Sequence, residues 1–195
     1  MIEVELKAKI ESIETMAETI ASTWISCSPY ENLIYRDHYF DDGSQTLSTS
    51  ERELRIREIN RPDNDTCQIQ LTFKDSPLDE QSKSKEETEL RISDVQEGVK
   101  LLKKLGYRQV LCFEKECVRC QYWYGEFLLL VTLAYVPELD TSFIELETQT
   151  DSPDDVEKLK KMLTGRLQQL GIKSDQITNE YYTDAIKTHR SSRQS

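Results

Sequence analysis

Charged side chains near the start of the chain recur at a spacing that suits a metal-bound anion. Glu3, Glu5 and Lys7 alternate with apolar residues. Because side chains of an extended strand point alternately to its two faces, these three charged groups share one face. Two carboxylates on one face repel each other unless a cation lies between them, and the nearby lysine suggests that an anion accompanies that cation. A polyphosphate bound to a divalent metal fits this combination.

The same two-residue spacing of charges returns in later segments. The carboxylates are Glu3, Glu5, Glu87, Glu89, Glu145 and Glu147, and the cations are Lys7, Arg55, Arg57, Lys74, Lys115 and Arg119. Carboxylate oxygens suit Mg²⁺ or Mn²⁺, whereas Arg and Lys side chains suit phosphate oxygens. A single Glu-x-Glu pair is more simply a solvated strand face, but its repetition favours one shared site.

Alternating patterns predict the strands that would position these charges. They cover residues 1–10, 33–41, 51–59, 67–74, 85–92, 107–122, 126–134 and 142–149. The strands of a sandwich place apolar residues in the core, whereas here many strands place charges on one face. A closed barrel with a wet, charged interior and helices on its apolar outer face resolves this conflict. We therefore predict an α+β protein built on an eight-stranded antiparallel closed barrel.

Helical spacing predicts three helices around this barrel. They cover residues 12–24, residues 94–105, and a last helix that Pro153 opens and Gly171 caps. Ser93 and Gln96 form a capping-box pattern before the second helix, and Gly106 ends it. Residues 41–50 and 75–83 are predicted loops, the second placed where it could gate a tunnel mouth. One domain is predicted over residues 1–186, followed by a short, disordered polar tail over residues 187–195.

Composition limits the partners. The 195 residues carry a formal net charge of −11, which disfavours non-specific binding to nucleic acid or to an acidic membrane. No apolar run reaches the length of a membrane span, and the N-terminus lacks a signal-peptide pattern. An odd count of five cysteines suggests reduced thiols. We expect a cytoplasmic protein that binds neither nucleic acid nor membrane.

The motifs and their order carry a family resemblance. In chain order they are Glu3-x-Glu5-x-Lys7, Tyr39-Phe40-Asp41, Leu54-Arg55-Ile56-Arg57, Leu71-Thr72-Phe73-Lys74, Lys85-Glu86-Glu87-Thr88-Glu89, Leu105-Gly106-Tyr107, Phe143-Ile144-Glu145-Leu146-Glu147 and Tyr181-Tyr182. The chain resembles the CYTH or triphosphate tunnel metalloenzymes, most closely their class IV adenylyl-cyclase-like branch. The resemblance covers nearly the whole chain.

The resemblance implies a barrel tunnel that binds a small-molecule triphosphate with Mg²⁺ or Mn²⁺. The metal ligands it implies are Glu3, Glu5, Glu145 and Glu147, with Glu87 and Glu89 as further candidates. The phosphate-binding residues it implies are Lys7, Arg55, Arg57, Lys74 and Lys115, and Arg119 is added to this set because it has the same strand parity as Lys115. Glu5, Lys74 and Glu145 are the predicted catalytic residues, in a protein expected to be a monomer or a homodimer.

Two positions depart from the family pattern. Cys117 stands where the family has Arg after Lys115, and Ala134 aligns where cyclase-like members tend to have Asp. Arg119 has the same strand parity as Lys115 and is a candidate replacement, one strand step of about 6.6 Å along the tunnel. These departures favour hydrolysis of inorganic triphosphate, a nucleoside triphosphate or thiamine triphosphate. The alternatives are a class IV adenylyl cyclase that makes cyclic AMP and pyrophosphate from ATP, and a non-catalytic barrel that binds polyphosphate or a nucleotide.

Overall fold

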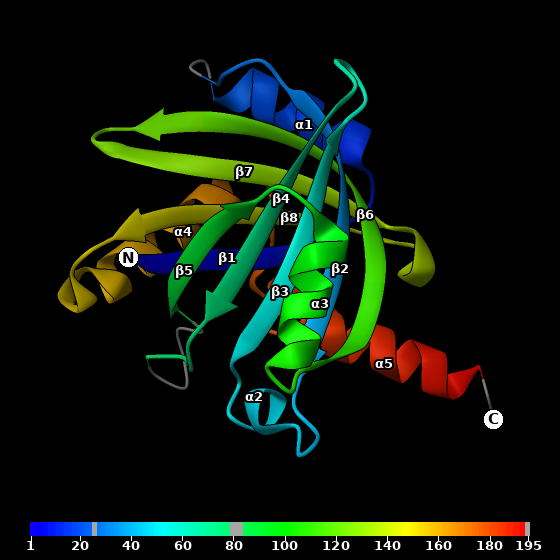
Figure 1. Ribbon diagram of the computed structural model, residues 1–195. Coiled ribbons are helices and arrows are strands. Elements are labelled where there is room, and N and C mark those ends of the chain that lie inside the picture. The colour runs from blue at the N-terminus through cyan, green and yellow to red at the C-terminus, as the bar shows by residue number, and fades with distance from the viewer. Residues whose placement is uncertain (25–26, 79–83, 194–195) are drawn as a thin grey trace.

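Eight antiparallel strands close into a barrel in the computed structural model, which describes residues 1–24, 27–78 and 84–193. The strands are β1 (Ile2–Ile10), β2 (Glu31–Asp41), β3 (Glu53–Arg61), β4 (Thr66–Lys74), β5 (Lys85–Ile92), β6 (Arg108–Tyr124), β7 (Phe127–Val136) and β8 (Thr141–Thr150). Their order around the barrel is β1-β5-β4-β3-β2-β6-β7-β8 (Figure 1). The predicted fold class is confirmed.

The pairing of β1 with its two neighbours is unequal. It pairs with β8 along its whole length, and this register sets Glu5 opposite Glu147. It meets β5 only near its own start, where Glu3 lies opposite Lys85. Beyond that point a C-terminal segment pairs with the free edge of β1, where Ile177 forms an antiparallel bridge with Ala8. The barrel therefore has a seam between β1 and β5 that the end of the chain covers.

Helices cover the outside of the barrel. They are α1 (Ile13–Thr23), α2 (Thr46–Thr49), α3 (Val95–Lys104), α4 (Val156–Gln169) and α5 (Tyr182–Ser192), with short 3-10 turns η1 (Pro137–Leu139), η2 (Pro153–Asp155) and η3 (Ser174–Gln176). Figure 1 shows α4 behind β1 and β8 and α3 across β3. None of the helices in the described ranges has the length and hydrophobicity of a membrane span.

The main hydrophobic core lies between the barrel wall and α1 and α4. Val4 and Leu146 on the outer faces of β1 and β8 are fully buried against Leu159, Leu163 and neighbouring side chains. The opposite faces of the same strands carry the charged residues. The alternation in the sequence thus separates an apolar outer surface, which packs against helices, from a polar interior.

A second core lies under α3. A Cβ on Gly98 would lie 2.7 Å from the Ile92 Cδ1 atom, so a larger residue here would require the ends of the Ile92 and Ile56 side chains to shift. Asp94 caps the helix by accepting a hydrogen bond from the backbone N–H of Glu97. The predicted capping box at Ser93 is therefore wrong by one residue.

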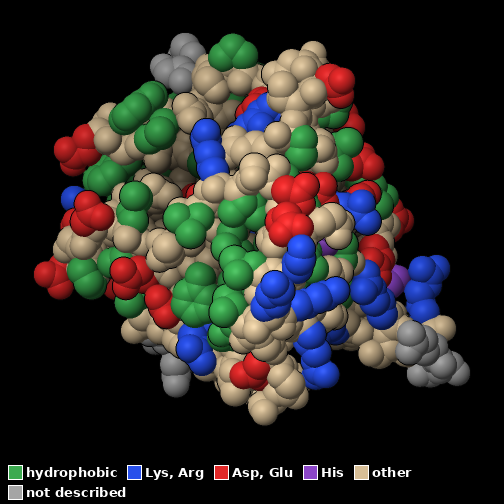
Figure 2. Space-filling view, viewed as in Figure 1, with side chains coloured by type: hydrophobic (Ala, Val, Ile, Leu, Met, Phe, Trp, Pro, Cys, Tyr) green, Lys and Arg blue, Asp and Glu red, His purple; other side chains and the backbone are tan. Residues whose placement is uncertain are grey.

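Figure 2 shows Lys and Arg side chains gathered on the face that carries α3, despite the negative net charge of the protein.

The C-terminus differs from the prediction. The helix that follows Pro153 ends where Gly171 adopts a φ of +83°, as expected, but α5 comes after it. The predicted disordered tail is wrong for residues 187–192, which belong to α5. Arg190 fixes this helix by pairing with Glu138 at 2.6 Å and by donating to the carbonyl oxygen of Cys112 at 2.8 Å. Tertiary contacts of this kind leave little trace in a short polar sequence.

The structure describes one of the two predicted loops in full and the other in part. Residues 41–50 contain the short helix α2, whose backbone N–H groups at Leu47 and Ser48 donate to the carboxylate of Asp41. The predicted loop at residues 75–83 lies partly outside the described residues, because positions 79–83 are not described. Its role as a gate stays a prediction.

Leu163→Ala tests the core between α4 and the barrel. Leu163 is fully buried, so we expect its truncation to lower the free energy of unfolding by about 2–5 kcal/mol. Leu101→Ala on α3 is the matched control, because Leu101 is 53% exposed and should change the free energy by less than about 0.5 kcal/mol. Urea unfolding measures both, and equal losses would contradict the assigned core.

Candidate active site

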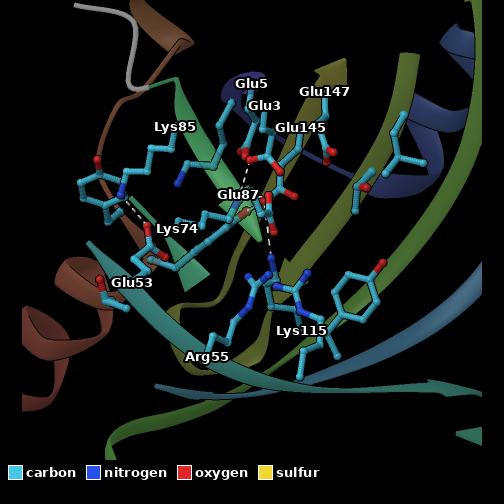
Figure 3. Close-up of a pocket in the computed structure, with 18 of the residues that line it drawn as sticks. Glu3, Glu5, Glu53, Arg55, Lys74, Lys85, Glu87, Lys115, Glu145 and Glu147 are labelled. Atoms are coloured by element: carbon cyan, nitrogen blue, oxygen red, sulfur yellow. Dashed lines mark hydrogen bonds and ion pairs between the residues drawn. The ribbon is translucent and has the colours of Figure 1, made fainter. Parts of the chain in front are cut away.

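A cavity of about 230 Å³, the tunnel cavity, lies inside the barrel. Every charged residue predicted for the site lines it: Glu3, Glu5, Lys7, Arg55, Arg57, Lys74, Glu87, Glu89, Lys115, Arg119, Glu145 and Glu147. Figure 3 shows the carboxylates of β1 and β8 gathered on one side, with Arg55 and Lys115 reaching toward them from the other. The strand register therefore brings together charges that are far apart in sequence.

The acidic side of the tunnel cavity is crowded. Burial, together with the nearby carboxylates of Glu145 and Glu3, raises the pKa of Glu5 to about 7. Burial and then the charge of Glu3 raise the pKa of Glu147 well above its usual value. Burial and a hydrogen bond with Glu3 raise the pKa of Glu87 to about 8. A bound cation would relieve this repulsion, since it favours the ionised form of each carboxyl group.

Lys74 neutralises part of the acidic side. Its Nζ atom lies 2.5 Å from Glu3 and 3.3 Å from Glu87. Burial acts to raise the pKa of Glu3, but the Lys74 ammonium, the hydrogen bonds with Glu87 and Lys74 and the charge of Arg55 together lower this pKa to about 2. Two neighbouring carboxyl groups thus differ strongly in their tendency to ionise, because Glu3 has the closer contact with Lys74.

Arginines of β3 form much of the basic side of the tunnel cavity. Asp37 of β2 is fully buried and accepts two hydrogen bonds from Arg57, at 2.5 and 2.7 Å. Burial opposes ionisation of Asp37, but the Arg57 guanidinium holds the pKa of that carboxyl well below its usual value. Arg55 is 92% buried, and within the described residues its Nε atom has no hydrogen-bond partner. Arg55 therefore has an unused donor beside the tunnel cavity, which suits an anionic ligand.

A tyrosine from α5 organises the region between the acids and bases. The Tyr182 hydroxyl donates a hydrogen bond to Glu145. The Nζ atoms of Lys7 and Lys115 lie 3.9 and 4.3 Å from the centre of the Tyr182 ring. Lys7 also donates to the carbonyl oxygen of Glu180 at 2.6 Å. The C-terminal segment thus orients two predicted phosphate-binding lysines as well as covering the seam.

The position of Arg119 explains how the chain differs from the family pattern. Arg119 lines the tunnel cavity, but its guanidinium donates to Glu31 at 2.8 Å and to the Tyr35 hydroxyl at 3.1 Å. Cys117 lies directly opposite Ala134 in the pairing of β6 with β7, and both are buried. Leu33, Tyr35 and Ile59 complete an apolar cluster with them. This cluster, the apolar patch, contains both positions that the sequence predicts to depart from the family pattern.

Several residues of the site had no predicted role in binding or catalysis. The lining also includes Tyr35, Tyr39, Glu53, Lys85 and Tyr182. Asp37 pairs with the lining residue Arg57. Tyr35, Asp37 and Tyr39 share one strand face, so the alternation in residues 33–41 contained the signal. Lys85 lies two residues before Glu87, and the same two-residue spacing separates the charged residues on the other strands of the site. Tyr182 belongs to the family motif Tyr181-Tyr182, but no strand alternation predicts its place in the site, because its position depends on how the C-terminus crosses the seam.

The carboxylates offer the hard oxygen donors that Mg²⁺ and Mn²⁺ prefer. Among the residues that the structure describes, no three acidic, His or Cys side chains already form a group that could hold a metal ion. Glu3 is engaged by Lys74, and Glu145 by Lys115 and Tyr182. Metal binding would therefore compete with these internal contacts, whereas the crowded Glu5 and Glu147 would gain from it.

The fold and this lining define a barrel whose interior joins an acidic wall to a basic wall around one cavity. The CYTH domain model matches residues 1–182, and the chain therefore belongs to the CYTH family. The match spans all eight strands and ends at Tyr182.

Relatives cover nearly the whole chain. Adenylate cyclase CyaB of Aeromonas hydrophila is 26% identical over 180 residues, which cover 92% of this chain and 86% of that protein. The structure of a Pyrococcus horikoshii protein is 27% identical, with a TM-score of 0.79 over 95% of this chain and 98% of that one. A Hippeastrum protein described as having a dominant triphosphatase activity is 21% identical, with a TM-score of 0.64 over 96% and 95%. At that identity, the likeness shows the shared fold.

Asp37→Asn tests the buried pair behind the basic wall. Removing the charge leaves Arg57 buried without its partner, so we expect a loss of about 3–5 kcal/mol in the free energy of unfolding at pH 7. The folded pKa of Asp37 is depressed, so its contribution is present above the unfolded pKa of about 3.9 and is lost as pH falls.

Unfolding measured from pH 7 down into the acid range should therefore show a smaller pH dependence for the variant than for the wild type. Asp175→Asn, at an exposed position, is the control and should follow the wild type. Parallel curves for wild type and Asp37→Asn would contradict the assigned pair.

Proposed function

We propose that the protein hydrolyses a triphosphate in the tunnel cavity, with Mg²⁺ or Mn²⁺ as cofactor. The observation that carries this proposal is the division of one buried cavity into a crowded carboxylate wall and a cationic wall that includes the unpartnered donor of Arg55. A chain of phosphates with a bound divalent ion has complementary charge to both walls.

The acidic residues are proposed to bind the metal ion and the basic residues to bind the phosphates. Glu3, Glu5, Glu145 and Glu147 would hold the ion, with Glu87 and Glu89 as further candidates. Glu89 is exposed and accepts a hydrogen bond from Thr72, which places it at the margin of the set. When bound, a divalent ion polarises phosphoryl oxygens and neutralises charge on the leaving group.

The cations Lys7, Arg55, Arg57, Lys74, Lys115 and Arg119 would fix the phosphate chain. Arg55 offers a directional guanidinium, while Lys7 and Lys115 offer point charges held against Tyr182. Lys74 pairs with Glu3 of the acidic wall, and from there it would stabilise charge on a transferring phosphoryl group. Glu5 and Glu145 are the proposed groups that orient the attacking water.

The apolar patch favours hydrolysis over cyclisation. Cyclase-like members of the family tend to have a cation and a carboxylate at the positions of Cys117 and Ala134, and here both are apolar and buried. The triphosphatase activity described for the Hippeastrum protein agrees with hydrolysis in this fold. Adenylyl cyclase activity is the second candidate, supported by the name of the Aeromonas relative.

Further parts of the proposal concern partners and location. A net charge of −11 and a cationic wall inside the tunnel cavity favour a small-molecule substrate over nucleic acid. We also propose a cytoplasmic location, consistent with the five free cysteines in the described part of the chain. The proposed oligomeric state is a monomer or a homodimer.

A product assay tests the reaction. The protein is incubated with Mg²⁺ or Mn²⁺ and with tripolyphosphate, ATP or thiamine triphosphate, and the products are separated by chromatography. We expect orthophosphate from at least one substrate, and no release after chelation of the metal. Cyclic AMP plus pyrophosphate from ATP would instead establish the cyclase.

Glu5→Gln separates an enzyme from a non-catalytic binder. The amide keeps the size of the side chain but removes the charge, so we expect kcat to fall by about 10²–10⁴-fold. Glu86→Gln is the control, because Glu86 is exposed and does not line the tunnel cavity. Tight triphosphate binding by calorimetry, with no product from either wild type or variant, would identify a binding protein.

Arg55→Ala tests the cationic wall. Loss of a charged donor to phosphate should weaken transition-state binding by about 1.5–3 kcal/mol, or roughly 10–100-fold in kcat/KM. Arg36→Ala on the same barrel removes a guanidinium whose side chain is 52% exposed and should leave kcat/KM unchanged. Equal effects of the two substitutions would contradict a specific role for Arg55.

A further inference from the structure

Two cysteines lie together on the outer side of the barrel wall, where the chain approaches β2. Cys27 forms an antiparallel bridge with Tyr122 of β6. Cys120 precedes Tyr122 by two residues, so strand alternation places both on the same face of β6. Cys120 is buried in the main hydrophobic core, and Cys27 is half-buried against the same core. The two side chains therefore share one face of the wall, although they are far apart in sequence.

The thiols of Cys27 and Cys120 contact each other through a hydrogen bond. Burial raises the pKa of Cys120 to about 12, and the neighbouring Cys27 thiol adds to this rise. Burial also raises the pKa of Cys27, whereas the hydrogen bond with Cys120 acts to lower it. Both thiols are therefore protonated at neutral pH. Since the thiolate is the reactive form, their oxidation is slow and needs sustained exposure to an oxidant.

The backbone around Cys27 is fixed against β6. The Ser28 N–H donates to the carbonyl oxygen of Gln121 at 2.8 Å, and the Gln121 N–H donates to the Ser28 hydroxyl at 2.9 Å. On the other side of Cys27, the Trp24 ring stacks on the Tyr122 ring with centroids 4.6 Å apart. These contacts keep the two thiols beside each other. A reaction between groups held in this way avoids most of the entropy cost of bringing them together.

The nearby Cys-x-x-Cys pattern does not supply the partner of Cys120. Cys117 and Cys120 are three residues apart on β6, so their side chains point to opposite faces. Cys117 belongs to the apolar patch with Tyr35 and Ile59, which line the tunnel cavity. Cys120 lies on the other side of the wall, where Cys27 is its neighbour. Only the folded structure reveals this pair, because the sequence pattern points to the wrong cysteine.

We propose that Cys27 and Cys120 form an oxidative modification site, at which a small-molecule disulfide such as glutathione disulfide converts the two thiols into an intramolecular disulfide. Neither residue lines the tunnel cavity, so this modification does not depend on the reaction proposed there. The bond would fasten the segment before β2 to β6. In a reducing compartment such a disulfide is transient and reports an oxidising change.

The exchange takes two steps. The thiolate of Cys27, which is the more exposed of the two, attacks one sulfur of glutathione disulfide, forms a mixed disulfide and releases one glutathione thiolate. The thiolate of Cys120 then attacks the Cys27 sulfur, forms the Cys27–Cys120 bond and releases the second glutathione thiolate. The two released thiolates take up the two protons that the cysteines lose. Two protein thiols are thus oxidised, and one glutathione disulfide is reduced to two glutathione molecules.

Mass spectrometry of proteolytic peptides tests the site after the full-length protein has been equilibrated with glutathione disulfide. We expect a linked pair of peptides that contain Cys27 and Cys120, with the loss of two hydrogen atoms, and its disappearance after reduction with dithiothreitol. The bond closes a large loop in the unfolded chain, so Tm should rise by about 5–15 °C on oxidation.

Three variants identify the residues that react. Cys27→Ala, at a half-buried position, should lose both the linked peptides and the rise in Tm. Cys67→Ala is the matched control and should keep both, because Cys67 is exposed and lies on β4, away from the pair. Cys120→Ala should stop at the first step and carry glutathione on Cys27. Circular dichroism of the reduced proteins checks that each variant is folded.

Other results would overturn the assignment. A linkage of Cys120 to Cys117 would show that the wrong pair was chosen. Glutathione that remains on Cys27 of the wild type, without a link to Cys120, would show that the two sulfurs cannot join. An equal rise of Tm in Cys27→Ala would show that the stabilisation has another source. None of these measurements uses turnover, so their outcome is independent of the proposed hydrolysis.

Discussion

The structure depends on the burial of many charges in one barrel interior. An isolated buried charge is costly, so each charge needs a partner or a ligand. The strand register supplies the partners: Arg57 with Asp37, Lys74 with Glu3, and Lys115 with Glu145. The surplus of carboxylates near Glu5 is left for a cation. The apolar outer face, packed against α1 and α4, keeps this arrangement closed.

Local patterns were sufficient to predict the barrel and most of its lining. Two-residue alternation identifies a strand and also decides which side chains share a face, so Arg55 and Arg57 could be placed in the interior before their strand order was known. Pairing partners could not be predicted in the same way. Asp37 lies on a predicted strand, but nothing in the sequence shows that β2 and β3 place it beside Arg57.

Errors concentrated where long-range contacts replace local signals. Residues 187–192 form a short polar segment with no sequence signal for a helix. They are helical because α5 is anchored by the burial of Ile186 and by the ion pair of Arg190 with Glu138. Strand parity correctly predicted that Arg119 faces the tunnel cavity, and its role as a substitute for the missing family arginine stays a prediction. Its engagement with Glu31 depends on the position of β2, which no spacing within β6 reveals.

The seam between β1 and β5 has a consequence for folding. Glu3 and Lys7 come from the first ten residues, while Tyr182 and the segment that covers the seam come from the last twenty. During synthesis on the ribosome, the acidic and basic groups of the interior would emerge long before the residues that order Lys7 and Lys115. The site is therefore completed only when the two ends of the chain meet, which makes its assembly a late event dominated by contacts of high sequence separation.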